Sequence, residues 1–270
     1  MISIIIPTLN EEDSIGATLE YLKGCISPHP NPLPQREREF KEAEIIVADG
    51  GSIDKTREIA SKYGVSVLTG TDSSRAFLMN LGAREAKGDI LFFLHADSYP
   101  PKSFLRDIEQ ALSDFGMRNA ECGITPNSEL RTPNFVGGAF DHKFSEDVFL
   151  LKVVSCFDRI RFRITRNYYG DQGIFVKKET FQRLGGYRNM SILEDSDFSE
   201  RLRSMGKTVL IRKRMLTSGR RFIKGGVIKT SMFMIWIRLL YRFGFDIESL
   251  AKTYRSFNTP TLPSPIEGEG

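Results

Sequence analysis

Three short segments of the sequence carry side chains that can do acid–base or metal chemistry. His95-Ala96-Asp97 follows the apolar run 90–94, Asp49-Gly50-Gly51-Ser52 follows the run 44–48, and Glu194-Asp195 opens a predicted helix. Carboxylate oxygens suit Mg²⁺ and Mn²⁺, and a carboxylate beside a hydroxyl can act as a general base. The segments therefore predict a site that holds a divalent cation with a diphosphate, and a base that activates a hydroxyl.

Each segment also has a purely structural explanation. Asp97 could cap a helix that begins near Pro101, Asp54 could cap the helix after its turn, and Glu194-Asp195 could be simple helix capping. Arg220-Arg221 could clamp a phosphate through their guanidinium groups, or could form a solvated face. Taken singly, these segments do not decide between chemistry and capping.

The elements that must position these residues alternate between strand and helix. Apolar runs predict buried strands at 2–6, 44–48, 65–68 and 90–94. Between and after them, helical spacing and closing glycines predict helices that open at 10–14 and span 55–63, 75–86 and 103–115. This alternation is typical of a Rossmann-like α/β fold with a mostly parallel sheet. Ligands of such folds bind beyond the carboxyl ends of the strands, where the acidic segments lie.

The pattern weakens after residue 115. Residues 121–125 and 135–144 predict short strands or loops of a small antiparallel extension. The remaining elements are predicted as a helix at 147–166, a strand at 171–176, helices at 178–184 and 194–204, and a final strand at 208–211.

We expect three regions in the chain. An α/β domain covers 1–222, a helical appendage covers 223–257, and a disordered tail covers 258–270. Within the first region, 25–40 holds four prolines followed by a run of charges, which predicts an exposed inserted loop. A docking role for this proline-rich loop is the alternative.

Composition and charge exclude several classes of protein. With 40% hydrophobic and 27% charged residues, the chain has the composition of a folded protein. Its net charge of +4 is too small to predict nucleic-acid binding, although basic clusters at 159–166 and 201–221 suit a phosphate-bearing ligand or an anionic membrane. Cys25, Cys122 and Cys156 lack metal-like spacing, which predicts free thiols in a reducing compartment.

We expect a cytoplasmic location. The chain begins directly in a strand without the features of a signal peptide, and its longest apolar stretch, 232–245, is too short to span a bilayer. Arg238, Arg242 and Trp236 give 227–243 the composition of a helix that lies on a membrane surface, here the inner face of the cell membrane. A helix packed on the core is the alternative.

The order of the motifs is more specific than any one of them. Pro-x-x-Asn-Glu after the first strand is followed by Asp-Gly-Gly-Ser-x-Asp-x-Thr, Leu-His-Ala-Asp-Ser, Gly-Asp-Gln-Gly and Leu-Glu-Asp-x-Asp. In this series the chain resembles the family-2 glycosyltransferases with the GT-A (nucleotide-diphospho-sugar transferase) fold, over 1–222 without the inserted loop. The helix 75–83 and the His-Ala-Asp spelling are similar to a bacterial subgroup of arsenosugar-biosynthesis glycosyltransferases.

The resemblance implies an inverting hexosyltransferase that moves a sugar from a nucleotide-diphosphate sugar, in the first place a UDP-sugar, to a small-molecule or lipid-linked hydroxyl acceptor. It implies Asp195 as the catalytic base with Glu194 beside it, and Asp97 as the ligand of a divalent cation, Mg²⁺ or Mn²⁺. The residues it implies for the nucleotide-sugar site are Pro7, Thr8, Asn10, Glu11, Asp49, Gly51, Arg75, Asn80, His95, Ala96, Arg220 and Arg221.

Two departures from the family pattern bear on this interpretation. His95 replaces the first aspartate of the Asp-x-Asp motif, which leaves its contact with the sugar-ribose or the metal open. Arg220-Arg221-Phe222 stands where a Gln-x-x-Arg-Trp motif would fall, which argues against processive polysaccharide synthesis. The alternatives are a sugar nucleotidyltransferase, although the expected Gly-rich loop is missing after the first strand, and a nucleotide-sugar-binding protein with little or no transferase activity.

Overall fold

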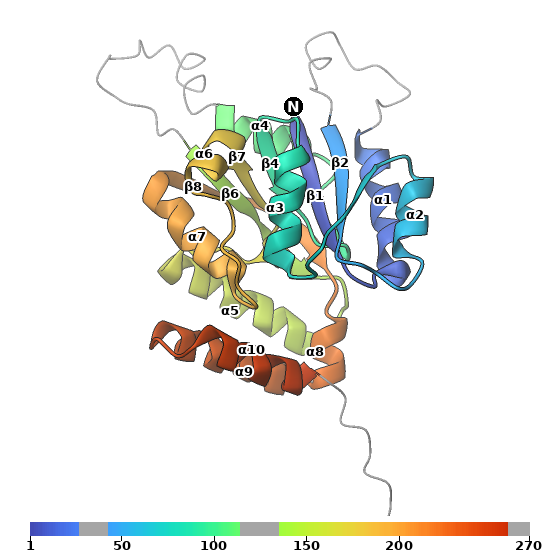
Figure 1. Ribbon diagram of the computed structural model, residues 1–270. Coiled ribbons are helices and arrows are strands. Elements are labelled where there is room, and N and C mark those ends of the chain that lie inside the picture. Colours follow the sequence, from blue (N-terminus) through green and yellow to red (C-terminus); the bar gives the residue numbers. More distant parts are fainter. Residues whose placement is uncertain (27–42, 114–134, 259–270) are drawn as a thin grey trace, which may run out of the picture.

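The apolar runs of the sequence form an eight-stranded sheet in the computed structural model, which describes residues 1–26, 43–113 and 135–258 (Figure 1). The strand order is β3-β2-β1-β4-β7-β6-β8-β5. The strands are β1 Ile2–Thr8, β2 Ala43–Asp49, β3 Ser66–Thr69, β4 Ile90–Phe93, β5 Ser98–Tyr99, β6 Phe135–Phe144, β7 Ile174–Lys177 and β8 Lys207–Thr217.

The helices follow the predicted alternation. They are α1 Glu12–Ile26, α2 Thr56–Lys62, α3 Arg75–Glu85, α4 Phe104–Ser113, α5 Phe149–Thr165, α6 Lys178–Arg183, α7 Glu194–Met205, α8 Arg220–Gly225, α9 Val227–Arg242 and α10 Ile247–Asn258, with a short 3₁₀ helix, η2, at Gly170–Gln172. Helix α3 is capped by the side chain of Ser74, which accepts a hydrogen bond from the amide of Phe77.

The first half of the sheet is parallel and the second half is mixed. Strand β1 pairs in parallel with β2 and β4, and β2 pairs in parallel with β3. Strand β7 runs antiparallel between β4 and β6, and β8 pairs in parallel with β6. The predicted antiparallel extension is present, and the carboxyl ends of β1, β2 and β4 meet at one edge of the sheet.

The predicted final strand is too short. It was expected at 208–211, whereas β8 continues to Thr217 and also pairs with β5, which the sequence did not predict. The cause lies in Arg212-Lys213-Arg214, whose exposed charged side chains hide the strand pattern although the backbone pairs with β6 and β5. The predicted helix at 103–115 is described as far as Ser113.

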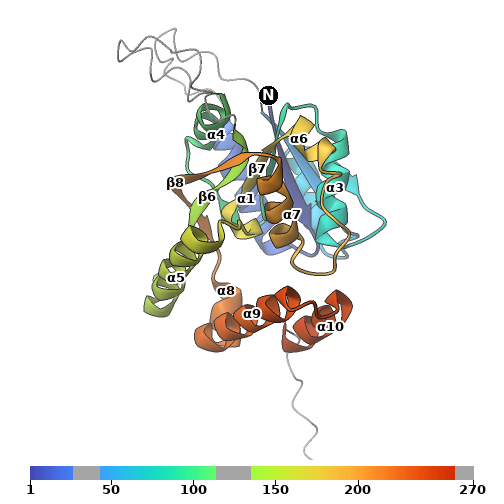
Figure 2. The same ribbon diagram turned by 90° about the vertical axis from the view of Figure 1, so that its left-hand side faces the viewer.

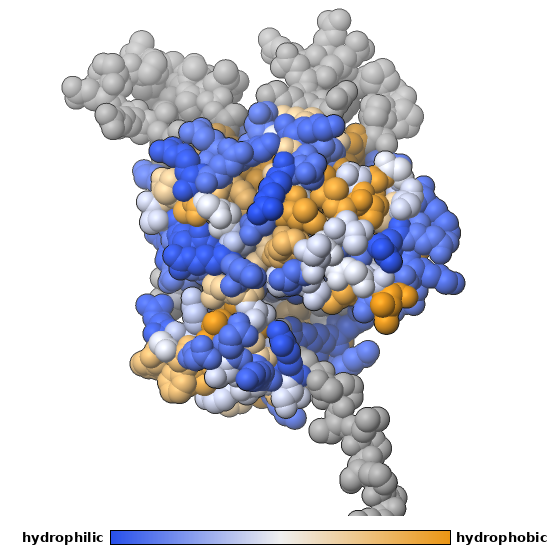
Figure 3. Space-filling model, in the orientation of Figure 1, coloured by the Kyte–Doolittle hydropathy of each residue, from blue (hydrophilic) through white to orange (hydrophobic). Residues whose placement is uncertain are grey.

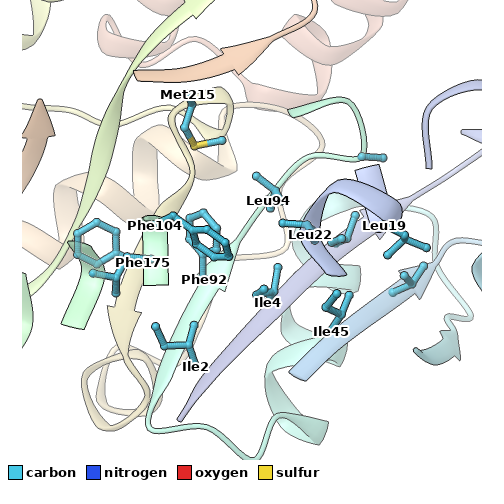
Figure 4. Close-up of a cluster of buried hydrophobic side chains, with 14 of the residues drawn as sticks. Ile2, Ile4, Leu19, Leu22, Ile45, Phe92, Leu94, Phe104, Phe175 and Met215 are labelled. Atoms are coloured by element: carbon cyan, nitrogen blue, oxygen red, sulfur yellow. The ribbon is translucent and has the colours of Figure 1, made fainter. Parts of the chain in front are cut away.

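Helices cover the sheet on both faces. On one face, α1, α2 and α4 pack their apolar side chains on β1, β2 and β4; Figure 4 shows Leu19 and Leu22 against Ile4 and Ile45. On the other face, α3, α6 and α7 enclose a second cluster that contains Phe93 of β4. Both clusters consist of aliphatic and aromatic residues that are almost completely buried, so they hold the strand ends in fixed positions.

The C-terminal helices lie below the sheet, next to α5 (Figures 1 and 2). Helices α9 and α10 form an apolar cluster around Ile237, Leu250 and Ala251, and this cluster includes Ile192 and Leu193 from the segment that precedes α7. Apolar residues also reach the surface over these helices (Figure 3). In the described residues, no helix is both long and apolar enough to cross a membrane.

Several predictions lie outside the described residues. They concern nearly all of the inserted loop at 25–40, the strand at 121–125, Cys122, and the tail after Asn258. Cys25 and Cys156 are free thiols, as predicted.

Candidate active site

The loops that follow β1 and β2 are tied together at the carboxyl edge of the sheet. The amide of Asn10 donates to Ser52 Oγ at 2.8 Å, and the amide of Ile53 donates to Asn10 Oδ1 at 3.0 Å. The amide of Glu11 donates to Thr56 Oγ1 at 2.8 Å. Asn10 adopts a φ of 54°, a left-handed conformation that asparagine tolerates better than most residues. The two loops therefore form one unit.

The buried carboxylate of Asp49 accepts hydrogen bonds from the end of β1 and from the loop after β2. Its side chain is fully buried, and its carboxylate accepts from Thr8 Oγ1 at 3.1 Å, from the amides of Gly51 and Ser52 at 3.0 and 2.8 Å, and from Ser52 Oγ at 2.5 Å. Arg57 Nε lies 3.7 Å from the same carboxylate. These partners occupy most of its lone pairs. Asp49 holds the loop in shape, and its predicted contact with a nucleotide base stays a prediction.

Asp97 stands beyond the end of β4 and does not cap a helix. Helix α4 begins only at Phe104, and the carbonyl of Ala96 is held by Thr18 Oγ1 at 2.6 Å. Burial raises the pKa of the Asp97 carboxyl, and the nearby carboxylate of Glu11 raises it further, while Arg220 opposes both. Asp97 is therefore a carboxylate beside a second carboxylate, close to a cation from α8.

His95 is directed to a different place from Asp97. Its Nε2 is buried and, among the described residues, has no hydrogen-bond partner. A Cβ added to Gly170 would lie 2.5 Å from this nitrogen, so the imidazole fits only because residue 170 is glycine. Burial and the charge of Arg75 lower the pKa of His95 to about 3. The imidazole is neutral at physiological pH.

Asp195 is held by the backbone amide of Gly170. This amide donates to Asp195 Oδ2 at 2.8 Å, and the amide of Ser196 donates to Oδ1 at 2.7 Å. Asp195 follows the first residue of α7, which begins after Leu193 in a left-handed conformation with a φ of 62°. The carboxylate thus bonds to a segment 25 residues away and has more than a capping role.

Glu194 points to the other side of the same turn. It is buried, and its Oε1 lies 3.2 Å from Arg75 Nη1 at the start of α3. Burial raises the pKa of Glu194, and the charge of Arg75 opposes that effect. The pair connects α3 to the beginning of α7, next to Asp195.

A small hollow brings several of the predicted residues together. It is lined by Pro7, Arg75, Met79, Phe93, Leu94, His95, Gly170, Ile174, Tyr187, Glu194 and Asp195. Five of the predicted site residues are therefore neighbours here, although they come from four separate stretches of sequence. Neither Gly170 nor Tyr187 was among the predicted site residues; the position of Gly170 in the Gly-Asp-Gln-Gly motif was the signal that could have indicated its contact with Asp195.

The structure does not bring the other predicted residues into this hollow. Asn80 uses both ends of its amide on the backbone of Tyr187, at 2.8 and 2.9 Å. Arg220 Nε donates to Ser218 Oγ at 3.1 Å, and the guanidinium of Arg221 lies 4.7 Å from the ring centroid of Tyr254. Asn80 thus positions the loop before α7, whereas Arg220 stays within electrostatic reach of Asp97.

The site fits a divalent cation that shares its ligands with a substrate. Within the described residues no group of three or more His, Cys, Asp and Glu side chains could hold a metal alone. Asp97, however, forms no ion pair in the described part of the chain, and Glu11 faces it electrostatically. Mg²⁺ is commonly bound by one or two carboxylates and substrate phosphates, a donor set that Asp97 matches. His95, whose Nε2 faces Gly170, does not join it.

Comparison with known sequences identifies related proteins. Residues 3–169 match the model of the family described as Glycosyl transferase family 2. A dolichyl N-acetyl-alpha-D-glucosaminyl phosphate 3-beta-D-2,3-diacetamido-2,3-dideoxy-beta-D-glucuronosyltransferase of Methanococcus voltae is 31% identical over 113 residues, 39% of this chain and 32% of that protein. The PGL/p-HBAD biosynthesis glycosyltransferase of Mycobacterium bovis is 28% identical over 211 residues, 74% of this chain and 69% of that protein. The chain thus covers about a third of the methanococcal relative.

Solved structures share the fold at low identity. A mannosyltransferase from Pyrobaculum calidifontis in complex with GDP-Man and Mn²⁺ aligns with a TM-score of 0.54 and 17% identity, over 80% of this chain and 56% of that one. Glucosyl-3-phosphoglycerate synthase from Mycobacterium tuberculosis, in complex with Mn²⁺, UDP and glucosyl-3-phosphoglycerate, aligns with a TM-score of 0.53 and 16% identity, over 91% and 81% of the two chains. The likeness confirms the predicted GT-A fold.

Proposed function

Because the chain belongs to glycosyl transferase family 2, we propose that it transfers a sugar from a nucleotide-diphosphate sugar to a hydroxyl acceptor, with inversion at the anomeric carbon. The observation that carries the proposal is the position of Asp195, which is fixed by the Gly170 amide at 2.8 Å and lines the hollow with His95 and Arg75. A carboxylate held in this way is oriented to accept a proton.

The proposed reaction assigns a separate task to each side of the site. The acceptor oxygen attacks the anomeric carbon and loses its proton to Asp195, while the bond from that carbon to the diphosphate oxygen breaks on the opposite face. The nucleoside diphosphate leaves with the electron pair of that bond. We assign Asp97 and Arg220, which interact electrostatically, to the diphosphate side, and a divalent cation bound at Asp97 would neutralise the charge of the leaving group. Orientation and charge stabilisation supply most of the acceleration.

We propose a UDP-sugar as the donor. Two proteins with this fold, Staphylococcus aureus TarS and the Mycobacterium tuberculosis synthase, were solved with uridine nucleotides, TarS among them with UDP-GlcNAc, and a third protein was solved with GDP-Man. A thermal-shift screen of UDP-, GDP- and dTDP-sugars, followed by UDP-release assays with and without Mg²⁺ or Mn²⁺, tests the donor, the metal and the activity. Binding of a nucleotide sugar without any release of nucleotide would instead indicate a binding protein.

We also propose a peripheral contact with the inner face of the cell membrane. Ile228, Met232, Ile235 and Leu239 follow helical spacing along α9, and each is between 49% and 65% exposed. Exposed Lys224, Lys229 and Arg242 stand near this apolar stripe in the sequence. An apolar stripe with basic neighbours suits anionic lipid. The methanococcal relative, by its name, acts on a dolichyl phosphate derivative, which supports a lipid-linked acceptor.

A further inference from the structure

Helix α9 carries an arginine to the segment that holds the proposed base. The guanidinium Cζ of Arg238 lies 4.0 Å from the ring centroid of Tyr169, and the Cζ of Arg161, from α5, lies 3.7 Å from the same centroid. Tyr169 directly precedes Gly170, whose amide donates to Asp195. Arg238 therefore contacts the residue next to the glycine that holds Asp195, although it comes from a helix beyond the 3–169 family match.

The two arginines differ in their polar partners. Arg161 Nε lies 3.2 Å from Asp158 Oδ1, and its Nη1 donates to the carbonyl of Asn167 at 3.1 Å. Arg238 has no carboxylate within 4.0 Å among the described residues, and its Nε is buried without an acceptor. A buried donor without an acceptor is costly, and the cost is larger for a charged group. Arg238 thus lacks the anionic partner that Arg161 has.

The nearby carboxylates do not fill this role. Asp158 pairs with Arg161, and both oxygens of Asp195 accept backbone hydrogen bonds. Asp171 has a buried Oδ1 without a partner among the described residues. Burial raises the pKa of Asp171, and the opposing effect comes from His142, whose Nε2 lies 3.9 Å from Asp171 Oδ2. A neutral carboxyl can donate a hydrogen bond to an anion, and it repels the anion less than a carboxylate does.

We propose that Arg238 and Asp171 form a binding site beside Asp195 for an anionic group, a phosphate or carboxylate, on the acceptor. This inference rests on the proposed function, because it is Asp195 that would deprotonate the acceptor hydroxyl. A guanidinium binds phosphate or carboxylate with two parallel hydrogen bonds, and stacking on Tyr169 fixes its orientation beforehand. The site makes α9 part of the active site, where the sequence predicted a separate appendage.

Binding of inorganic phosphate to the full chain loaded with UDP and Mg²⁺ tests this site. Saturating UDP occupies the diphosphate region, so that isothermal titration with phosphate reports on the acceptor side. Arg238→Ala should weaken phosphate binding about tenfold or more, because it removes a charge-assisted hydrogen-bond pair. Arg238→Lys, which keeps the charge, should retain part of the affinity. Arg242→Ala is the matched control, since it removes an exposed arginine one turn further along α9 and should change the affinity less than twofold.

The outcomes are distinct. Absence of phosphate binding to the wild-type protein, or equal affinities of the Arg238→Ala and Arg242→Ala variants, would overturn the inference. If circular dichroism shows that Arg238→Ala does not fold, the Arg238→Lys variant is measured instead. If this variant binds phosphate and glycerol 3-phosphate with the same affinity and stoichiometry as the wild-type protein, that result would count against a bidentate site. Failure of UDP to bind any variant would count against the proposed function, and the phosphate titration without UDP would still report on Arg238.

A second set of ligands distinguishes a lipid-linked acceptor from a soluble acceptor. Glycerol 3-phosphate and decyl phosphate carry the same anionic group, but only decyl phosphate carries an alkyl chain. A lipid-linked acceptor predicts tighter binding of decyl phosphate, and a soluble acceptor predicts equal or tighter binding of glycerol 3-phosphate. In both cases Arg238→Ala should reduce the affinity about tenfold, and an Arg238-independent preference would contradict the site.

Discussion

At the scale of single residues, the two aspartates that matter most lie in different surroundings. Asp195 accepts hydrogen bonds from two backbone amides, so its orientation is fixed before substrate arrives. Asp97 has Glu11 as an electrostatic neighbour and Arg220 as the charge that opposes it. The first arrangement suits a base, and the second suits a carboxylate that shares a cation with phosphate oxygens.

Replacement of Asp195 by asparagine separates its catalytic role from its structural role. The amide oxygen can still accept from Gly170, but the side chain cannot take a proton. We expect UDP release to fall about 10²–10⁴-fold, with the UDP dissociation constant nearly unchanged in calorimetry. Asp13→Asn, an exposed aspartate in the first turn of α1, is the control. Parallel loss of UDP binding and turnover would show that Asp195 is not the base.

Removal of the Asp97 carboxylate should act on metal-dependent binding. In Asp97→Ala we expect the affinity for UDP in the presence of Mn²⁺ to fall about tenfold or more, since even outer-shell changes at metal sites have effects of this size. The affinity measured in EDTA should change little. If the Mn²⁺ titration of UDP binding is the same in wild type and Asp97→Ala, the metal is held elsewhere.

His95 gives a third prediction, because this chain departs from the family motif there. His95→Asp restores the family residue but puts a carboxylate into a buried position near Glu194 and Asp195. We expect it to lower the free energy of unfolding by about 1–3 kcal/mol more than His95→Asn, which stays neutral. Urea denaturation measures the difference. Equal stabilities of the His95→Asp and His95→Asn variants would mean that the position tolerates a charge. Burial would then not explain why this chain has a histidine where the family has an aspartate.

At the scale of elements, the base depends on how η2 and α7 meet. The imidazole of His95 lies against Gly170 of η2, Gly170 holds Asp195, and Leu193 before α7 keeps a left-handed conformation. Such a conformation is costly for a leucine and persists only where packing enforces it. The cluster that Leu193 forms with Ile237 and Leu250 supplies this packing. The C-terminal helices thus contribute to the geometry of the base.

Gly170→Ala tests the close approach of η2 to His95. The added Cβ would lie 2.5 Å from His95 Nε2, and because this imidazole is buried we expect the Gly170 segment to shift and to take its amide away from Asp195. We expect turnover to fall at least about tenfold with UDP binding retained, because small misplacements of a catalytic group are costly. Gly24→Ala in α1, where the new Cβ meets nothing within 4 Å, should leave turnover unchanged. Restoration of turnover in the double variant His95→Ala/Gly170→Ala would strengthen this explanation, and equal turnover of Gly170→Ala and wild type would refute it.

At the scale of the whole molecule, α9 has two distinct apolar faces. One face packs Ile237 against α10, and the other exposes the stripe that contains Ile235 and Leu239. Figure 2 shows α9 and α10 on the side of the molecule away from most of the sheet-covering helices. A membrane contact on this side would leave the acceptor site next to the lipid surface.

Liposome sedimentation tests the membrane contact. We expect binding to vesicles of anionic phospholipid and none to neutral vesicles, with a loss at high salt because the electrostatic part is screened. Ile235→Ser should weaken binding by disrupting the exposed stripe, whereas Ile53→Ser, an exposed apolar residue on the sheet domain, should not. Sedimentation of the wild-type protein with neither type of vesicle would remove the membrane from the proposal.

The sequence by itself determined the framework of the molecule and the family to which it belongs. The parallel strands β1, β2 and β4 are continuous apolar runs, and such runs need no distant information to be identified. Once these strands are parallel, their carboxyl ends share one edge, so the position of Asp97 at that edge follows from its place after β4. The order of the motifs indicated the glycosyltransferase family, which the match over 3–169 confirms.

Only the tertiary structure decided how the individual side chains are used. The predicted nucleotide contacts of Asp49 and Asn80 stay predictions, but the structure adds hydrogen bonds that the sequence pattern does not indicate: Asp49 accepts from its own loop, and Asn80 bonds to the backbone of Tyr187, 107 residues away. His95 faces Gly170, and Arg238 reaches Tyr169, across separations that no local pattern encodes. Strand propensity and helical spacing act over a few residues, whereas these contacts depend on how α9, η2 and α7 pack together.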